Sequence, residues 1–276
     1  MANEDMDRHW NEVAGPEWLE REREFDTALG PFGDELLRRS APRAGEHVLD
    51  VGCGFGATTT AIATAVGSEG RVMGLDISAP LLERAKQRAA GATNVTWRHG
   101  DAQVAPLPAH HFDLVVSRFG VMFFDDPVAA FANIHAATKP EGRLCVACWQ
   151  STERNGWYTL PTRVLAEHIA LPAAPTGGAG PFAFADPGHV RRVLAAGGWN
   201  SIDVDGFEAP MLYGAGGNVD RVIHHLVRGP VAAALASAPA GDSAAGLAAL
   251  RRAVEEYTVN GETRFPGVAW MTAARA

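Results

Sequence analysis

Three glycines at alternate positions, Gly52, Gly54 and Gly56, lie between an apolar run and a run rich in alanine and threonine. The apolar run, 47–51, reads as a strand, and residues 57–66 read as a helix. Glycines at such a junction let the backbone turn tightly and let a ligand approach the chain, while the helix start offers free N–H groups. The pattern predicts a site for a nucleotide-like ligand. The alternative interpretation is close packing of the helix on the strand.

Two common phosphate-binding patterns are missing from this turn. A dinucleotide fingerprint would place a glycine at position 57, where the sequence has Ala57. A phosphate-gripping loop needs a lysine directly after its glycines, and no lysine precedes Lys86. The turn therefore does not favour a ligand rich in phosphate.

Two aspartates at the ends of predicted strands narrow the ligand further. Asp76 ends a strand over 71–76, where a carboxylate can accept hydrogen bonds from both ribose hydroxyls. Asp101 ends a strand over 95–101 and can accept a hydrogen bond from an adenine amino group. Because the turn has no cation for phosphate, these carboxylates favour an adenosine ligand without phosphate, and S-adenosylmethionine fits that description. Alternatively, both aspartates only cap the helices or turns that follow.

Strands and helices alternate through the segment that carries these residues, as expected for a parallel sheet covered by helices on both faces. The helix signals agree, because Ser78 is a suitable N-cap, with Pro80 in the first turn and Gly91 past the end. The expected order is a helix over 57–66, a strand over 71–76, a helix over 78–91, strands over 95–101 and 112–119, a helix over 126–139 and a strand over 142–149.

The flanking segments read as helical additions to this core. The N-terminal part reads as helix on either side of Gly30 and Pro31. Because the additions lack a sheet of their own, we expect them to cover the carboxyl edge of the sheet as a lid. After Trp149 we expect helical insertions over 156–171 and 218–256, a loop rich in proline and glycine over 172–189, and strands over 201–213 and 267–276.

Five short motifs together resemble the successive motifs of class I S-adenosylmethionine-dependent methyltransferases, in the branch similar to ubiquinone/menaquinone and small-molecule methyltransferases. They are VLDVGCGFG, GLDIS, HGDA, FDLVVSRF and KPEGRLCVACW, and they cover roughly residues 45–150. The resemblance implies an α/β, Rossmann-like three-layer sandwich whose seven-stranded sheet is mostly parallel with an antiparallel last strand. We therefore expect a helical lid over 1–40, a core that binds S-adenosylmethionine over 41–150, and the rest of the sheet with its insertions over 151–276.

The same resemblance implies which positions hold the cofactor. The glycine turn would line its methionine part, the ends of the second and third strands would hold ribose and adenine, and the end of the fourth strand would lie beside the sulfonium. In that order the residues are Gly52, Cys53, Gly54 and Gly56; Asp76 and Ile77; Asp101 and Ala102; and Ser117.

Methyl transfer from a sulfonium is an in-line displacement that requires a positioned acceptor and exclusion of water. A general base, usually a histidine, would assist a hydroxyl acceptor. Relatives often carry a polar residue or histidine shortly after the fourth strand, where this sequence has Met122 and Phe123. The only charged group there is Arg118, a candidate for contact with a substrate or cofactor carboxylate. His224 and Tyr213 remain as weak candidates for a base, so we expect catalysis mainly by proximity and orientation.

Aromatic residues cluster in the segments expected to form the lid. Most of them would belong to the core, and the remainder would form an apolar pocket for a small molecule of moderate size, aromatic or polyketide- or peptide-like. The expected substrate-binding set is Trp10, Trp18, Phe25, Arg118, Phe119, Met122 and Phe123. Oxygen is the favoured acceptor atom, ahead of nitrogen and carbon.

Composition and charge set aside several other classes of partner. The chain has 276 residues, 24 basic against 32 acidic side chains and a formal charge of −8, with no basic run that would follow a phosphate backbone. No apolar run approaches the roughly 20 residues of a membrane span, and the start of the chain is acidic where a signal peptide would be basic. We expect a cytoplasmic protein with no nucleic-acid or membrane partner, and a homodimer remains open.

The cysteines and histidines do not favour a metal site. Cys145 and Cys148 form C-x-x-C within a predicted strand, where residues three apart point to opposite faces and cannot converge on one ion. His110 and His111 lie in a predicted loop, and no pair of ligands stands at helical i, i+4 spacing. We therefore expect no metal.

Three rival interpretations remain open. One is a nicotinamide-dependent oxidoreductase on a similar sheet, although the third fingerprint glycine and a Tyr-x-x-x-Lys pair are missing. Another is a protein that binds S-adenosylmethionine without catalysis. Within the favoured class, the acceptor could also be a peptide or protein carboxylate.

Overall fold

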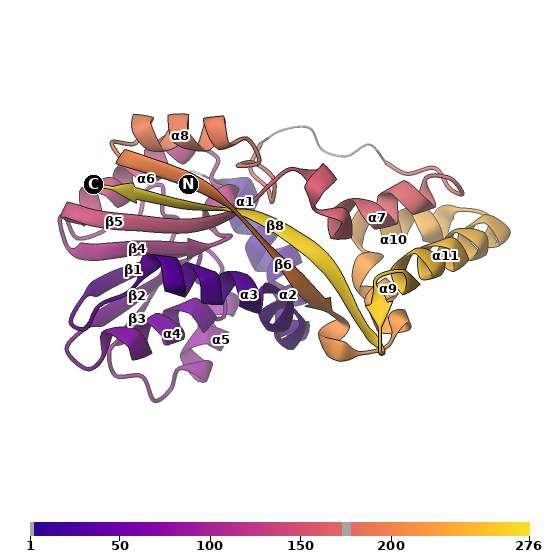
Figure 1. Cartoon of the computed structure of the whole chain (residues 1–276), viewed down its shortest axis with the longest axis horizontal. Coiled ribbons are helices and arrows are strands. Elements are labelled where there is room, and N and C mark those ends of the chain that lie inside the picture. Colours follow the sequence, from indigo (N-terminus) through magenta and orange to yellow (C-terminus); the bar gives the residue numbers. More distant parts are fainter. Residues whose placement is uncertain (1–2, 173–177) are drawn as a thin grey trace.

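The computed structural model of the chain describes residues 3–172 and 178–276 and shows one mixed sheet flanked by helices (Figure 1). The path through the sheet is β3-β2-β1-β4-β5-β8-β6, and the short strand β7 pairs with β8. The parallel strands are β1 (His47–Val51), β2 (Arg71–Asp76), β3 (Val95–His99), β4 (Phe112–Arg118) and β5 (Thr138–Trp149).

The two central strands explain why this sheet must be covered on both faces. In β1, Val48, Leu49 and Val51 are all buried, so successive side chains on both faces are removed from water. Strand β4 repeats the pattern with Leu114 and Val115 fully buried. Such continuous apolar strands are typical of parallel sheets with helices on each side. The α/β sandwich predicted from the sequence is confirmed.

The last two long strands run antiparallel to their neighbours, as expected for the final strand. Strand β8 (Glu262–Arg275) lies between β5 and β6 (Asn200–Tyr213) and is antiparallel to both. It begins five residues before the predicted start at 267, because its first part pairs with the end of β6 and with β7 (Thr258–Val259). The sheet therefore has eight strands rather than seven.

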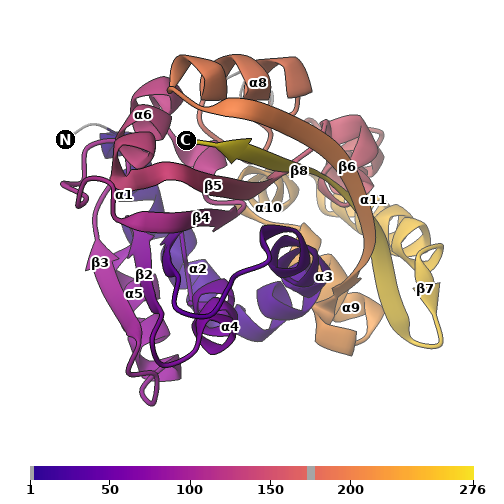
Figure 2. The same cartoon turned by 60° about the vertical axis from the view of Figure 1, so that its left-hand side comes forward.

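Helices lie on both faces of the sheet (Figure 2). Helices α6 and α8 lie on one face in Figure 1, and α3, α4 and α5 lie on the other. The N-cap signals hold: the hydroxyl of Ser78 accepts from the backbone of Leu81, and the carboxylate of Asp186 caps α8. The bounds are α3 Glu22–Ser40, α4 Ala57–Val66, α5 Ala79–Arg88, α6 Pro127–Ala137 and α8 Pro187–Ala196.

Helix α3 corrects one prediction, because it runs without interruption through Gly30 and Pro31. A proline inside a helix removes one hydrogen bond and usually bends or ends the helix. Here the following turns bury Phe32 and Leu36 completely, and α3 packs along β4, β5 and β6. The apolar area buried against the sheet outweighs the local preference.

Two groups of helices extend beyond the sheet and form the lid. The first is the N-terminal run of α1 (Glu4–Arg8), a π-helical turn (His9–Val13) and α2 (Ala14–Glu20). The second lies at the far ends of the long strands β6 and β8 (Figure 1). It contains α7 (Gly156–Leu165), α9 (Val219–Leu226), α10 (Gly229–Ser237) and α11 (Ala240–Glu255).

The second group corrects the predicted extents of the insertions. The helix predicted over 156–171 ends at Leu165, and the segment predicted over 218–256 divides into three helices. Arg228 is extended at the first junction and Ala238 is extended before Pro239 at the second. Of the loop predicted over 172–189, residues 173–177 lie outside the described part, and α8 already begins at Pro187.

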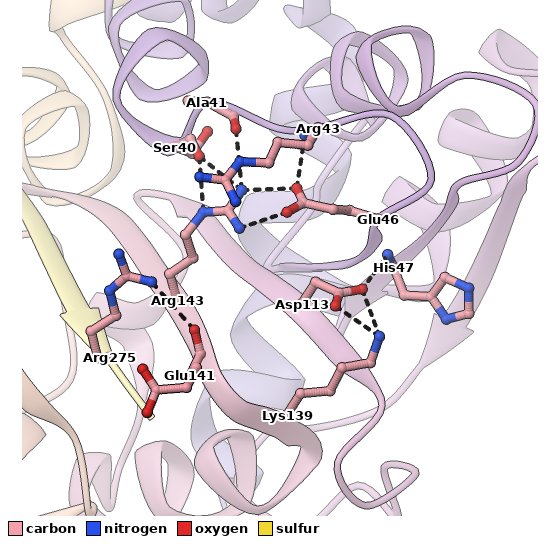
Figure 3. Close-up of polar contacts among 10 residues, drawn as sticks. All are labelled: Ser40, Ala41, Arg43, Glu46, His47, Asp113, Lys139, Glu141, Arg143 and Arg275. Atoms are coloured by element: carbon pink, nitrogen blue, oxygen red, sulfur yellow. Dashed lines mark hydrogen bonds and ion pairs between the residues drawn. The ribbon is translucent and has the colours of Figure 1, made fainter.

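Partly buried ion pairs fix the amino edge of the parallel strands (Figure 3). The guanidinium of Arg143 on β5 binds both carboxylate oxygens of Glu46, just before β1, at 2.6 and 2.8 Å, and also donates to the carbonyl of Ala41 beyond α3. Lys139 donates to both oxygens of Asp113 at 2.7 and 2.8 Å. These contacts join β1, β4, β5 and the end of α3 at the edge opposite the carboxyl ends of the strands.

The cysteines lie as the strand geometry predicts. Cys145 packs with the apolar cluster under α3 and α4, whereas Cys148 packs with the cluster on the other face. Both are buried free thiols. The two sulfur atoms of the C-x-x-C sequence therefore point away from each other.

Within residues 3–172 and 178–276, no helix is both long and apolar enough to span a bilayer.

Candidate functional site

A cavity of about 280 Å³ lies at the carboxyl ends of the parallel strands. Its floor is formed by the ends of β1, β2 and β4, and its walls come from the N-terminal helices and from the helices inserted near β6. In open α/β sheets, ligands bind at this edge, where the strands open into loops. The lid predicted over the carboxyl edge is therefore present and closes over the cavity.

The glycine turn forms the first part of the floor. Gly52 and Gly54 have φ angles of +66° and +53° and line the cavity. A Cβ on Gly52 would lie 2.7 Å from the Cα of Gly120, because the turns after β1 and β4 touch backbone to backbone. Gly56 does not line the cavity, and a Cβ there would lie 2.4 Å from the Trp97 ring. Its role is the close packing that was the alternative interpretation of the turn.

Asp76 lies at the end of β2 and faces the same floor. One carboxylate oxygen accepts from the backbone N–H of Gly54 at 2.7 Å, and the other accepts from the N–H of Ser78 at 2.8 Å. Burial raises the pKa of this carboxyl, and the backbone hydrogen bonds counteract the effect. Asp76 is thus held rigidly between the glycine turn and the start of α5. Ile77 also lines the cavity.

Asp101 and Ala102 line the cavity beyond the end of β3. The Asp101 carboxylate accepts from both the backbone and the side-chain amide of Gln103, at 3.0 and 2.9 Å. Asn133 on α6 donates to the carbonyl of Ala102 at 2.8 Å. The loop that carries Asp101 is therefore fixed to α6 and forms one edge of the cavity.

Asp50, which the sequence reasoning missed, carries a buried oxygen with no partner. The residue is 1% exposed and lines the cavity. Its Oδ2 accepts from the hydroxyl of Thr59 at 2.6 Å, whereas Oδ1 has no hydrogen bond in the described structure. Burial raises the pKa of this carboxyl to about 7. The signal in the sequence was an acidic residue inside an otherwise apolar strand, immediately before the glycine turn.

Ser117 lies outside the cavity, contrary to expectation. It is fully buried, its hydroxyl donates to the carbonyl of Val51 at 2.7 Å, and the same oxygen accepts from the N–H of Gly120 at 3.1 Å. The hydroxyl thus fastens the turn after β4 to the end of β1. Both of its hydrogen-bonding roles are already occupied.

Arg118 brings a positive charge into the cavity from the end of β4. Its side chain is 16% exposed and its two protein contacts are weak, a 3.5 Å hydrogen bond to the carbonyl of Leu29 and a 4.0 Å approach to Asp26. Burial lowers the pKa of this guanidinium. A buried cation with such long contacts has capacity for a carboxylate ligand.

Aromatic rings make up much of the remaining wall. Trp18 stacks on Phe25 with 3.9 Å between ring centroids, and Phe119 stacks on Trp149 at the same separation. Phe119 has a φ of +65°, a strained backbone that an aromatic residue rarely adopts. Among predicted substrate residues, Trp10, Trp18, Phe25, Arg118, Phe119, Met122 and Phe123 all line the cavity; Trp149, Trp157, Tyr158 and Met211 do so without having been in that set.

The N-terminal segment is pinned over the floor by side chains that the sequence did not single out. Asn11 donates to the carbonyl of Ile77 and accepts from the N–H of Ala79, both at 3.0 Å. Asn3 donates to the carbonyl of Phe123 at 3.0 Å. In this segment the Trp10 ring packs edge-on against the rings of Phe123 and Trp18, with centroids 5.1 and 5.4 Å away.

Of the two candidate bases, Tyr213 lines the cavity and His224 does not. Tyr213 is buried at the end of β6 and lines the cavity, and burial raises the pKa of its hydroxyl. His224 is exposed on α9 and does not line the cavity, so the structure does not support its candidacy. Its neighbour His225 does line it. Adjacent helical residues point about 100° apart, and the packing of α9 rather than the sequence selected which one faces inward.

The charged and polar groups on the cavity floor suit a zwitterionic adenosine ligand better than they suit a metal ion. A buried carboxylate oxygen without a partner, a guanidinium with long contacts, and free backbone at two glycines lie on one floor. Within the described ranges, no group of three or more His, Cys, Asp or Glu side chains is arranged to hold an ion.

Comparison with known proteins matches the same segment. Residues 48–142 match the model of a family described as "Methyltransferase domain". Aklanonic acid methyltransferase DauC of Streptomyces sp. (strain C5) is 39% identical over 116 residues, covering 41% of this chain and 53% of that protein. Demethylmenaquinone methyltransferase of Geobacillus stearothermophilus is 38% identical over 121 residues, covering 43% and 52%. The chain spans about half the length of these curated relatives.

A solved structure extends the likeness of fold to most of the chain. Phosphoethanolamine N-methyltransferase 2 of Haemonchus contortus, in complex with S-adenosyl-L-methionine, aligns over 88% of this chain and 52% of that one with a TM-score of 0.53. The sequence identity is 16%, so this likeness concerns the fold alone.

Proposed function

We propose that the protein transfers a methyl group from S-adenosylmethionine to a small aromatic molecule, and that residues 48–142, which match a family described as "Methyltransferase domain", bind the cofactor. The observation that carries the proposal is the division of one cavity into a polar floor and an aromatic wall. The floor suits the cofactor and the wall suits the acceptor.

Each part of the floor matches one part of the cofactor. The unpartnered Oδ1 of Asp50 would accept from the α-ammonium group, a charge-assisted bond that offsets the cost of burying this carboxylate. Arg118 would bind the α-carboxylate. Asp76 would accept from the ribose hydroxyls and Asp101 from the adenine amino group. When bound, the cofactor supplies a methyl group on a positively charged sulfur.

The wall favours a flat acceptor. Trp10, Trp18, Phe119 and Trp149 offer ring faces and edges on which a conjugated ring system can pack. The relatives that match the domain are named for aklanonic acid and demethylmenaquinone. Together these observations support a polycyclic or quinone-like acceptor carrying a hydroxyl, with oxygen as the methylated atom.

The chain itself would catalyse transfer chiefly by positioning. The ring contacts that close the cavity exclude water from the reacting atoms, and the strained Phe119 fixes one side of the acceptor pocket. Tyr213 keeps its proton, because burial raises its pKa, and it can donate a hydrogen bond to the acceptor oxygen.

Calorimetric titration tests the cofactor. S-adenosylmethionine and S-adenosylhomocysteine should bind, whereas oxidised and reduced nicotinamide cofactors should not. The variant Asp76→Ala should lose affinity, and Asp203→Ala, which removes an exposed carboxylate on β6, should not. Binding of a nicotinamide alone would refute the proposal and favour an oxidoreductase.

Turnover tests the acceptor. Hydroxyanthraquinones and hydroxynaphthoquinones, incubated with the cofactor, should gain the mass of one methyl group. If peptide carboxylates but not these rings are methylated, the acceptor is a carboxylate and not a hydroxylated aromatic ring. Cofactor binding without transfer to any hydroxylated aromatic would indicate a binding protein without this catalysis.

A further inference from the structure

Glu24 and His225 meet beside the cavity, where helix α3 contacts the lid helix α9. The Nδ1 atom of His225 on α9 lies 2.8 Å from Oε2 of Glu24 on α3. The His225 side chain is 11% exposed and that of Glu24 is 7% exposed. A carboxylate accepts a hydrogen bond, so its position assigns a proton to Nδ1, and in the neutral imidazole the lone pair then lies on Nε2.

The charges around this pair hold the carboxylate in place. Glu24 also accepts from the guanidinium of Arg21 at 2.9 Å and from that of Arg221, on the same helix as His225, at 2.7 Å. Two guanidiniums thus share the carboxylate with the imidazole. These contacts fix the position of the carboxylate beside Nδ1 of His225.

The His225 ring lies beside the aromatic part of the cavity. The His225 ring lies 4.9 Å from the ring of Tyr213 and 5.8 Å from that of Phe25, and all three residues line the cavity. Among the described residues, Nε2 has no hydrogen-bond partner, whereas Nδ1 is fixed by Glu24. One ring nitrogen is therefore oriented and the other is available to a ligand.

We propose that His225 is the general base for the acceptor hydroxyl and that Glu24 is the residue that positions it. The inference rests on the proposed function and specifies its acceptor as a hydroxyl whose proton must be removed. The hydroxyl proton passes to Nε2 as its oxygen forms the new bond to the methyl carbon. The electron pair of the broken sulfur–carbon bond stays on sulfur. The proton on Nε2 is then released to solvent, which restores the base.

The arrangement has the three parts of a general-base site. The base is within the cavity, a carboxylate fixes its tautomer, and Tyr213 lies beside it to hold the oxygen. A purely structural contact between α3 and α9 would need neither a place on the cavity wall nor an aromatic neighbour carrying a hydroxyl.

A coloured phenol can report proton removal without turnover. Alizarin changes its absorption when it ionises, and it would be titrated into the protein saturated with S-adenosylhomocysteine, at a pH where the free dye is fully protonated. The wild type should bind the dye with the spectrum of its anion. His225→Asn should bind it with the spectrum of the neutral form. His224→Asn is the matched control, because it changes the exposed neighbour on the same helix, and it should behave as the wild type.

The rate of methyl transfer to the same dye gives a second readout. His225→Asn should lower kcat by about 10²- to 10⁴-fold with little change in KM, the range for loss of a general base. Glu24→Gln should shift the limb of the pH profile of kcat that reports the base, while S-adenosylhomocysteine binds with unchanged affinity.

Three outcomes would overturn the inference. The first is that His225→Asn binds the dye with the spectrum of its anion. The second is that the lower rate of His225→Asn is fully explained by a loss of affinity for the cofactor, as expected if the contact only holds α3 and α9 together. The third is failure of the wild type to bind the dye. The proposed function fails separately, if S-adenosylhomocysteine does not bind to the wild type.

Discussion

Replacing Asp50 by asparagine should stabilise the ligand-free protein at alkaline pH and weaken its hold on the cofactor. Burial raises the pKa of Asp50 from 3.8 to about 7. Between those values the folded protein keeps a proton that the unfolded chain has lost, so stability falls as the pH rises toward 7. A shift of roughly 3 units corresponds to about 4 kcal/mol in total.

The measurement is the difference in the free energy of unfolding between Asp50→Asn and the wild type, from urea denaturation at pH 5 and at pH 8. With pKa values of 3.8 and about 7, the difference should grow in favour of the variant by about 2.5 kcal/mol between these two pH values. The amide has its own cost beside Thr59, but that cost does not depend on pH and cancels. Asp203→Asn, an exposed carboxylate, is the control.

The affinity of Asp50→Asn for the cofactor should fall, although the ligand-free protein becomes more stable at alkaline pH. Loss of the charged acceptor should weaken binding of S-adenosylmethionine by about 1.5–3 kcal/mol in a calorimetric titration. A stability difference that is the same at pH 5 and pH 8 would refute the claim that Asp50 carries a buried, costly charge. Unchanged cofactor affinity would refute its assignment to the ammonium group.

Three further experiments test other parts of the structure. Asp76→Ala should weaken cofactor binding by about 1–3 kcal/mol without unfolding the protein, as measured by calorimetry and circular dichroism. Gly52→Ala should lower the midpoint of urea denaturation more than Gly54→Ala, because both positions have positive φ but only the first would also meet backbone; equal midpoints would contradict this contact. Arg143→Leu should cost about 1–3 kcal/mol, because the partly buried Glu46 loses both guanidinium hydrogen bonds and keeps only that from the backbone N–H of Arg43. Burial alone would raise the pKa of Glu46, but its hydrogen bonds with Arg143 hold it below its usual range, so this loss should shrink as acid protonates the carboxyl.

The cofactor floor was predictable because its signals are local. The turn at Gly52 and Gly54 needs positive φ, and its glycines stand directly after an apolar strand. Asp76 and Asp101 each follow a strand, and parallel strands bring their carboxyl ends to one edge. Alternating patterns therefore predicted the parallel sheet and the place of these residues, whereas the antiparallel last strand was implied by the family resemblance.

Other parts of the floor depended on contacts that no local pattern contains. Ser117 looked suited to a ligand, but its hydroxyl is occupied by the carbonyl of Val51, on a different strand. Asp50 was not among the predicted site residues, and one of its oxygens has no hydrogen-bond partner in the described structure. Pro31 looked like a helix end, but packing on the sheet carries α3 through it.

The sequence by itself determined the class of fold and the edge of the sheet at which the cavity lies, because strand and helix periodicity and turn chemistry act over a few residues. Only the tertiary structure decided which distant side chains meet at the wall of this cavity. Glu24 and His225 are 201 positions apart, and the choice of His225 over His224 depends on the rotation of α9 against α3. Such convergence follows from the packing of distant helices, which is set by the burial of apolar surface over the whole molecule and leaves no spacing to read along the chain.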